Sequence, residues 1–364
     1  MTSLSETPDA SPNNSIESPR ISSGARTLNA STVATITRIF ALTVAAYAFV
    51  FVINNFIIFV GGWPGLNNLA AHYGWFGLEA PATPLEATSI VQGWIQLAAY
   101  FIIFLMAVFY VLKTPRTKLE TEGEALNQLS LFIARWAFWS ILLIGIVDAT
   151  ISFYRVEGAL VNLVGADIAK QLGRPVYRGL VTQLPLMAVG FIIACFTRGL
   201  GFTWLSILIV VAELQIVIAR FVFSYEQAFM GDLVRFWYAG LFLFSSAYTL
   251  QQEGHVRVDI LYAGFTERKK AWSNTLGVIF LGLPICWLVL NRGLWGKANT
   301  LNAPLLNFEI SQSGYGMYVK YLMAGFLIVY AVTMIIQFSS YLLHNVAVLI
   351  GEKDAHVSAE DQII

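Results

Sequence analysis

Apolar residues recur along this chain in long blocks separated by short polar stretches. A helix rises 1.5 Å per residue, so about 20 apolar residues cross a hydrocarbon core of about 30 Å. The blocks that reach or approach this length are Phe40 to Val60, Ile90 to Leu112, Leu131 to Phe153, Leu184 to Phe196, Phe202 to Phe223, Phe229 to Leu250, Trp272 to Asn291 and Tyr321 to Leu343. The pattern predicts an all-α polytopic membrane protein with about eight transmembrane helices. The fourth block is short and spans only if residues 180–183 are included.

Composition supports this fold class. The chain has 364 residues, of which 57% are hydrophobic and 12% charged, whereas a soluble domain has about 25% charged residues. This excludes a soluble protein and makes the lipid bilayer the expected environment. The formal net charge is zero, which gives no reason to expect a nucleic acid partner.

Polar segments flank the apolar blocks at both ends. Residues 1–35 are rich in Ser, Pro and Asn, which predicts a disordered cytoplasmic tail. We therefore divide the chain into this tail, an N-terminal extension over residues 36–200 with about four spans, a four-helix membrane domain over residues 201–348 and a polar C-terminal tail over residues 349–364.

Lys and Arg gather in alternate loops, which places both termini in the cytoplasm. The loop Gly61 to Ser89, assigned outside, has neither residue type. Residues 154–182 disagree with the rule, because four basic residues lie on the assigned outer side: Arg155, Lys170, Arg174 and Arg178. The apolar residues of this segment recur every four positions: Val156, Leu160, Val164, Ile168 and Leu172. That spacing predicts an amphipathic helix lying in the membrane interface.

Motifs of catalysis and cofactor binding are missing from the sequence. There is no HExxH, GxSxG, Walker A or GxGxxG motif, so we do not expect an enzyme. Cys195 and Cys286 lie apart inside apolar blocks, and the histidines are scattered. We therefore expect no metal site, no haem and no other cofactor.

Ionisable residues inside or at the edges of spans are the candidates for function, because each costs about 2.5–3.5 kcal/mol at the bilayer centre. They are Arg135, Asp148, Glu213, Arg220, Asp232 and Arg235. Glu213 and Arg220 are two helical turns apart and share one face, while Asp232 and Arg235 form an i,i+3 pair. These residues either line an ion or substrate pathway or pair with other helices to fix the packing of the bundle.

One polar segment resembles a known family. The sequence His255-Val256-Arg257-Val258-Asp259 follows the sixth block, and Glu309-Ile310-Ser311 and Lys320 precede the last. With the four-span framing over about residues 202–345, these motifs resemble the small membrane subunit of TRAP transporters, the tripartite ATP-independent periplasmic transporters. The common small subunit has four spans, so the resemblance does not explain the extension.

The resemblance implies a small permease subunit in a bacterial inner membrane. Its partners would be a large membrane subunit, which carries the moving substrate site, and a periplasmic binding protein that delivers a solute such as an organic acid. An ion gradient would drive uptake. The family motif residues His255, Arg257, Asp259, Glu309 and Lys320 are then expected at subunit contacts. Two alternatives remain: an autonomous ion-coupled carrier or channel using Glu213, Arg220 and Asp148, and a scaffold or sensor without transport.

Overall fold

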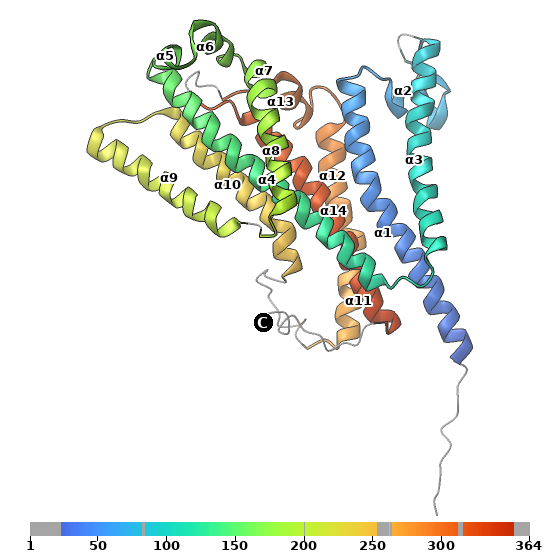
Figure 1. The fold of residues 1–364 in the computed structure, drawn as a ribbon. Helices are drawn as coiled ribbons and strands as arrows, with labels where there is room; N and C mark the ends of the chain where they lie inside the picture. The colour runs from blue at the N-terminus through green and yellow to red at the C-terminus, as the bar shows by residue number, and fades with distance from the viewer. Residues whose placement is uncertain are drawn as a thin grey trace, which may run out of the picture.

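Helices form almost all of the chain that the structure describes (Figure 1). This computed structural model describes residues 23–81, 84–199, 201–252, 262, 264–311 and 316–352, with side chains from residue 30 onward. The long helices are α1 (Ser23–Phe59), α3 (Ala87–Lys113), α4 (Leu119–Val156), α8 (Leu184–Phe196), α9 (Phe202–Phe223), α10 (Ala228–Gln251), α11 (Glu267–Gly277), α12 (Leu283–Leu294) and α14 (Lys320–Ile350). No strand occurs in these ranges, and the all-α polytopic fold is confirmed.

Seven stretches of the described residues are long and apolar enough to cross a membrane: 30–59, 87–113, 119–156, 175–196, 202–223, 267–294 and 320–350. Six of them contain a predicted block completely, and the first contains all of its block except Val60. The remaining block, Phe229 to Leu250, forms the 24-residue helix α10 but is not among the seven. The charged residues Asp232 and Arg235, together with Trp237, Tyr238 and Ser245, lower its mean hydropathy. Helix α10 also packs against both α4 and α14, so it needs less lipid-compatible surface than an outer helix.

The fourth span is longer than the apolar block that predicts it. Helix α7 (Pro175–Arg178), the π-helical segment η2 (Gly179–Gln183) and α8 follow one another without a break and give a span of 22 residues. Arg178 and Gln183 interrupt the apolar pattern, but both side chains are fully buried inside the protein. Burial against protein rather than lipid explains why a hydropathy pattern underestimates this helix.

Two predictions about polar segments are wrong. Residues 154–182 do not form one amphipathic helix, because α4 ends at Val156 and is followed by the short helices α5 (Leu160–Val164) and α6 (Ala166–Leu172) before α7. Gly158 and Gly165 have positive φ angles and break the helix. Residues 23–35, predicted within a disordered tail, are helical as the first part of α1. Residues 1–22 and 353–364 lie outside the described residues.

Helices α4 and α14 form the centre of the bundle. Helix α14 packs against α1, α4, α10, α11 and α12, and 50% of its apolar window is buried, against 17% for the outer helix α3. One apolar cluster joins α14 to α1 and α12, with Ala45, Leu290 and Ile335 at its core. A second joins α4 to α9 and α10. The N-terminal extension is therefore packed into the same bundle as the helices that follow it.

The short elements lie at the end of the bundle away from the start of α1 and the end of α14 (Figure 1). They are α2 (Gly65–His72), η1 (Trp75–Gly77), α5, α6 and α13 (Asn302–Asn307), while the π-helical segment η3 (Val278–Gly282) lies within the span that joins α11 to α12. Helices α1 and α14 therefore place the first and last described residues on one side of the bundle (Figure 1), which fits eight crossings if α10 is counted with the seven stretches.

Close packing of α4 against α10 depends on Gly145, where a Cβ atom would collide with the indole of Trp237. We expect Gly145→Ala to lower the free energy of unfolding by about 1–3 kcal/mol, as overpacked cores do. Thermal unfolding of the purified chain in detergent measures this. Gly231→Ala in α10 is the matched control, because nothing lies within 4 Å of its Cβ position. Equal midpoints for the two variants would contradict the packing described.

Candidate functional site

A buried ion pair lies where the N-terminal extension meets the last helices of the chain. Asp148 from α4 and Arg178 from α7 are 1% and 0% exposed, and Arg178 Nε lies 2.6 Å from Asp148 Oδ1. Arg178 Nη2 also donates to the main-chain oxygen of Asp148 at 2.6 Å and to Ser152 Oγ at 2.8 Å. Asp148 is thus already committed to a cation, and does not stand free as a proton carrier would.

Side chains from other elements complete this cluster. Gln183 from η2 donates to Asp148 Oδ1 and to the main-chain oxygen of Tyr318, each at 2.9 Å. The main-chain N–H of Tyr318 donates to Asp148 Oδ2 at 2.9 Å, and the Tyr321 hydroxyl donates to Gln183 Oε1. We call Asp148, Arg178, Gln183, Tyr318 and Tyr321 the Asp148 network. It joins α4, α7 and η2 to the segment that begins α14.

Two of the basic residues that violate the positive-inside rule, Arg155 and Arg178, interact with other residues in this region. The guanidinium of Arg178 lies 4.7 Å from the Tyr318 ring centroid, and that of Arg155 lies 4.5 Å from it. Arg155 Nη2 also donates to the main-chain oxygen of Gly316 at 2.9 Å. These two charges face protein rather than the membrane surface, so counting them as topology signals overstates the charge on the assigned outer side.

A second buried ion pair connects α1 to α4 at the other end of the bundle. Arg38 and Glu122 are 3% and 5% exposed, and their side chains lie 2.5 Å apart. Arg38 also donates to the main-chain and hydroxyl oxygens of Thr114 at 2.8 Å. Arg38 thus connects α1 to α4 and to the residue that follows α3.

Asp232 and Arg235 form the expected i,i+3 pair, with 3.7 Å between Arg235 Nη1 and Asp232 Oδ1. Asp232 is mainly occupied elsewhere, because Ser311 Oγ and the main-chain N–H of Met317 each donate to Asp232 Oδ2 at 3.1 Å. Arg235 is 77% exposed. Asp232 therefore fastens the start of α10 to the segment that precedes α14.

The family motif residues divide into two groups. His255, Arg257 and Asp259 lie outside the described residues, so their expected subunit contacts remain a prediction. Glu309 and Lys320 pair with each other at 2.5 Å and are 44% and 47% exposed. This pair connects the end of α13 to the start of α14 on the surface.

The remaining intramembrane charges are not brought together. Arg135 Nη1 donates to the main-chain oxygen of Arg198 at 2.9 Å. Arg220 on α9 is exposed and pairs with Glu226 at 3.4 Å, not with Glu213. Glu213 is exposed and has no hydrogen bond or ion pair within the described part of the chain. The structure therefore does not assemble Glu213, Arg220 and Asp148 into one pathway.

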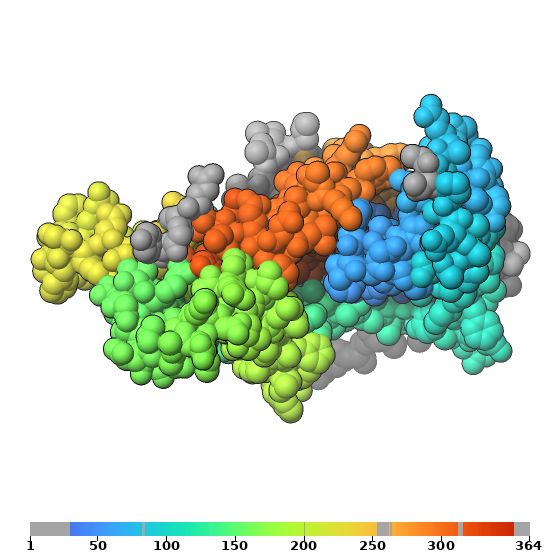
Figure 2. All heavy atoms as spheres, turned by 90° about the horizontal axis from the view of Figure 1, so that it is seen from above, coloured from blue at the N-terminus to red at the C-terminus, as the bar shows by residue number. Residues whose placement is uncertain are grey.

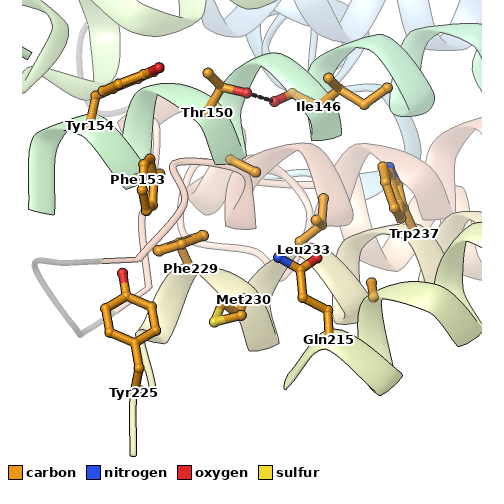
Figure 3. A pocket seen from close by; sticks show the side chains of 12 residues that line it. Ile146, Thr150, Phe153, Tyr154, Gln215, Tyr225, Phe229, Met230, Leu233 and Trp237 are labelled. Carbon is orange, nitrogen blue, oxygen red and sulfur yellow. Dashed lines mark hydrogen bonds between the residues drawn. The ribbon is translucent and has the colours of Figure 1, made fainter. Parts of the chain in front are cut away.

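An apolar cleft of about 440 Å³ lies between α4, α9 and α10. Figure 3 shows Phe153, Phe229 and Met230 around it, with the amide of Gln215 on one side. Tyr225 lies at its edge and donates to Glu157 Oε1 at 2.7 Å. Partial burial and this bond raise the pKa of Tyr225 to about 12, so its hydroxyl stays a donor near neutral pH.

The polar groups described here suit packing and recognition rather than bond-making chemistry. Among the described residues, no three His, Cys, Asp or Glu side chains come together as a metal ion would require. Sequence reasoning missed Arg178, Gln183, Tyr318 and Tyr321 as partners of Asp148. The surplus of basic residues in 154–182 was the available signal, because a charge that breaks the topology rule needs a partner elsewhere.

A family model matches the later part of the chain. Residues 206–346 match the family model described as "Tripartite ATP-independent periplasmic transporters, DctQ component". The resemblance in the sequence is thereby confirmed, over nearly the range expected. Neither the curated proteins nor the solved structures contain a match to the chain. The matched range begins within α9 and ends within α14, so it includes α10 but not α4 or α7.

Removing one partner of the Asp148–Arg178 pair leaves a buried charge without compensation. We expect Asp148→Asn to lower the free energy of unfolding by about 3–5 kcal/mol, measured by thermal unfolding in detergent. Adding Arg178→Gln to Asp148→Asn should restore part of this loss.

Lys320→Gln is the control, because its exposed pair with Glu309 should contribute about 1 kcal/mol or less. If Asp148→Asn were no more harmful than Lys320→Gln, the Asp148 network would not hold the bundle together.

Proposed function

Because residues 206–346 match the DctQ component of TRAP transporters, we propose that this chain is the small permease subunit of such a transporter. Its spans fit a multi-pass membrane subunit. The match is the observation that carries the proposal. In this role the chain is a transport component and not an enzyme.

We further propose that the chain is the fixed partner of a large membrane subunit. The charges inside the bundle support a fixed role, because Asp148 and Arg38 are held in buried ion pairs. A carrier that moves ions needs groups that change partners or protonation during transport. The large subunit would hold the substrate site, and a periplasmic binding protein would deliver a solute such as an organic acid under an ion gradient.

Isolation from the native membrane tests this function. A tagged chain, extracted in mild detergent, should bring with it a larger polytopic protein in a fixed ratio, identified by mass spectrometry. Deleting the gene should abolish uptake of the solute that this larger protein transports, and expression of the unmodified chain should restore it. Recovery of the chain alone in several detergents, with solute transport by the chain alone in liposomes, would contradict the proposal.

We propose that both termini face the cytoplasm of a bacterial inner membrane, with the loop Gly61 to Ser89 outside. In a background carrying Cys195→Ala and Cys286→Ala, a cysteine introduced at Asn67 should react with an impermeant thiol reagent in intact cells. A cysteine introduced at Thr266 should react only after the membrane is opened. The reverse labelling would invert the topology without affecting the assignment to the family.

A further inference from the structure

Helix α9 lies at the edge of the bundle and leans away from it (Figure 1). Seen from above, the segment around the end of α9 and the start of α10 projects from the rest of the molecule (Figure 2). Leu205, Ile209 and Ala212 form its buried face, and among the helices α10 is its principal neighbour. Most of the remaining surface of α9 is exposed, including Val210 at 66% and Val217 at 49%.

Another outer helix, α3, shows what an ordinary lipid-facing surface looks like in this protein. Its exposed residues include Phe101 at 61% and Met106 at 60%. From Ala87 to Leu112 the helix has no charged residue, as the hydrocarbon core requires. Helix α9 is exposed to a similar extent, but it carries Glu213.

Glu213 lies near the middle of the 22-residue α9, about 15 Å from either end at 1.5 Å per residue. It follows the buried Ala212 and is therefore turned about 100° from the packed face. Its carboxyl group is exposed and has no partner within the described residues. A carboxylate at this depth needs a donor, and no group in the described part of this chain supplies one.

The flank of α9 that carries Glu213 becomes more polar toward the outer end. Ile216, one turn further on, lines a cleft of about 230 Å³ together with Glu226, Asp232 and Arg235. Arg220 follows one turn later and is 61% exposed. Gln215 lies on the opposite flank and faces the apolar cleft against α4. Glu213 therefore lies at the deep end of a stripe that ends in exposed charges of both signs.

We propose that this flank of α9 is the docking surface for a transmembrane helix of the large membrane subunit, which presents a hydrogen-bond donor or a cation to Glu213. We call the exposed residues Val210, Glu213, Val217 and Arg220 the α9 flank. This inference rests on the proposed function and adds the surface through which the two subunits meet. The exposed apolar residues supply close packing, and Glu213 fixes the register of the partner helix, because only one depth places the donor opposite it.

Photo-crosslinking in native membranes tests the surface directly. A benzophenone amino acid at Val210 or Val217 should form an adduct with the large subunit. The same group at Phe101 on α3 is the control, because that position is equally exposed and should react only with lipid. Lipid adducts alone at Val210 and Val217, or adducts with a second copy of this chain, would overturn the docking surface.

Substitution of the carboxyl group tests the role of Glu213. We expect Glu213→Leu to lower the amount of large subunit recovered with the tagged chain by about tenfold or more, the effect of losing a charged hydrogen bond. Glu213→Gln keeps an acceptor and should lose less. The thermal unfolding midpoint of the isolated chain should not fall in either variant, since Glu213 contacts no described group. Recovery of the large subunit at the unmodified level with Glu213→Leu would overturn the proposal.

Gln215→Leu is the matched control, because it removes a polar group one-half turn away on the other flank and should leave recovery of the large subunit unchanged.

The proposed function and the docking surface would fail in different ways. If no larger membrane protein accompanies the unmodified chain, the proposed function is wrong and the docking surface with it. If the large subunit is recovered but α9 does not reach it, only the docking surface is wrong.

Discussion

A positive charge held inside an apolar bundle is the constraint on which the rest of this structure depends. Arg178 is fully buried, and a guanidinium in that position costs several kcal/mol unless its partners are well placed. Its own partners are Asp148 and Ser152 of α4 and the Tyr318 ring, and Asp148 is held in turn by Gln183 of η2 and by the main-chain N–H of Tyr318 before α14. Stabilising this buried ion pair therefore requires three distant parts of the sequence to come together. The ion pair thus helps to specify how the helices are arranged.

The outer helices were the easiest elements to predict from sequence. Helix α3 is apolar over most of its length and largely exposed, and its ends lie within three residues of the predicted ones. Helix α10 was predicted to within one residue at each end, but α7 was harder, because its Arg178 is fully buried against protein and interrupts the apolar pattern. A hydropathy pattern reports contact with lipid, so it loses accuracy as a helix becomes buried against its neighbours.

The candidate site could be predicted in part for a similar reason. Charged residues in spans are rare enough to identify, and Asp148, Glu213 and Asp232 stood out. Their partners did not, because a main-chain N–H such as that of Tyr318 carries no signal in the sequence, and Gln183 is uncharged. The i,i+3 pair of Asp232 and Arg235 follows from helix geometry, whereas the bond from Ser311 to Asp232 depends on tertiary folding.

The extension is part of the bundle that contains the matched segment. Trp237 of α10 donates to the main-chain oxygen of Ile141 in α4 at 3.2 Å, and Ser130 of α4 donates to that of Thr333 in α14 at 3.0 Å. Helix α4 thus provides one wall for both α10 and α14. The helices before residue 200 complete the packing of those after it, which a four-span segment would have to achieve with fewer neighbours.

The burial of α14 has a consequence for biosynthesis. Half of its apolar window is covered by other helices, yet it leaves the ribosome after every other described helix. During insertion, the surfaces of α1, α4 and α10 that later pack against α14 therefore face lipid. The bundle can close only after this last helix has been synthesised, so the Asp148 network forms late. Until then, water or lipid headgroups must solvate the charges of Asp148 and Arg178.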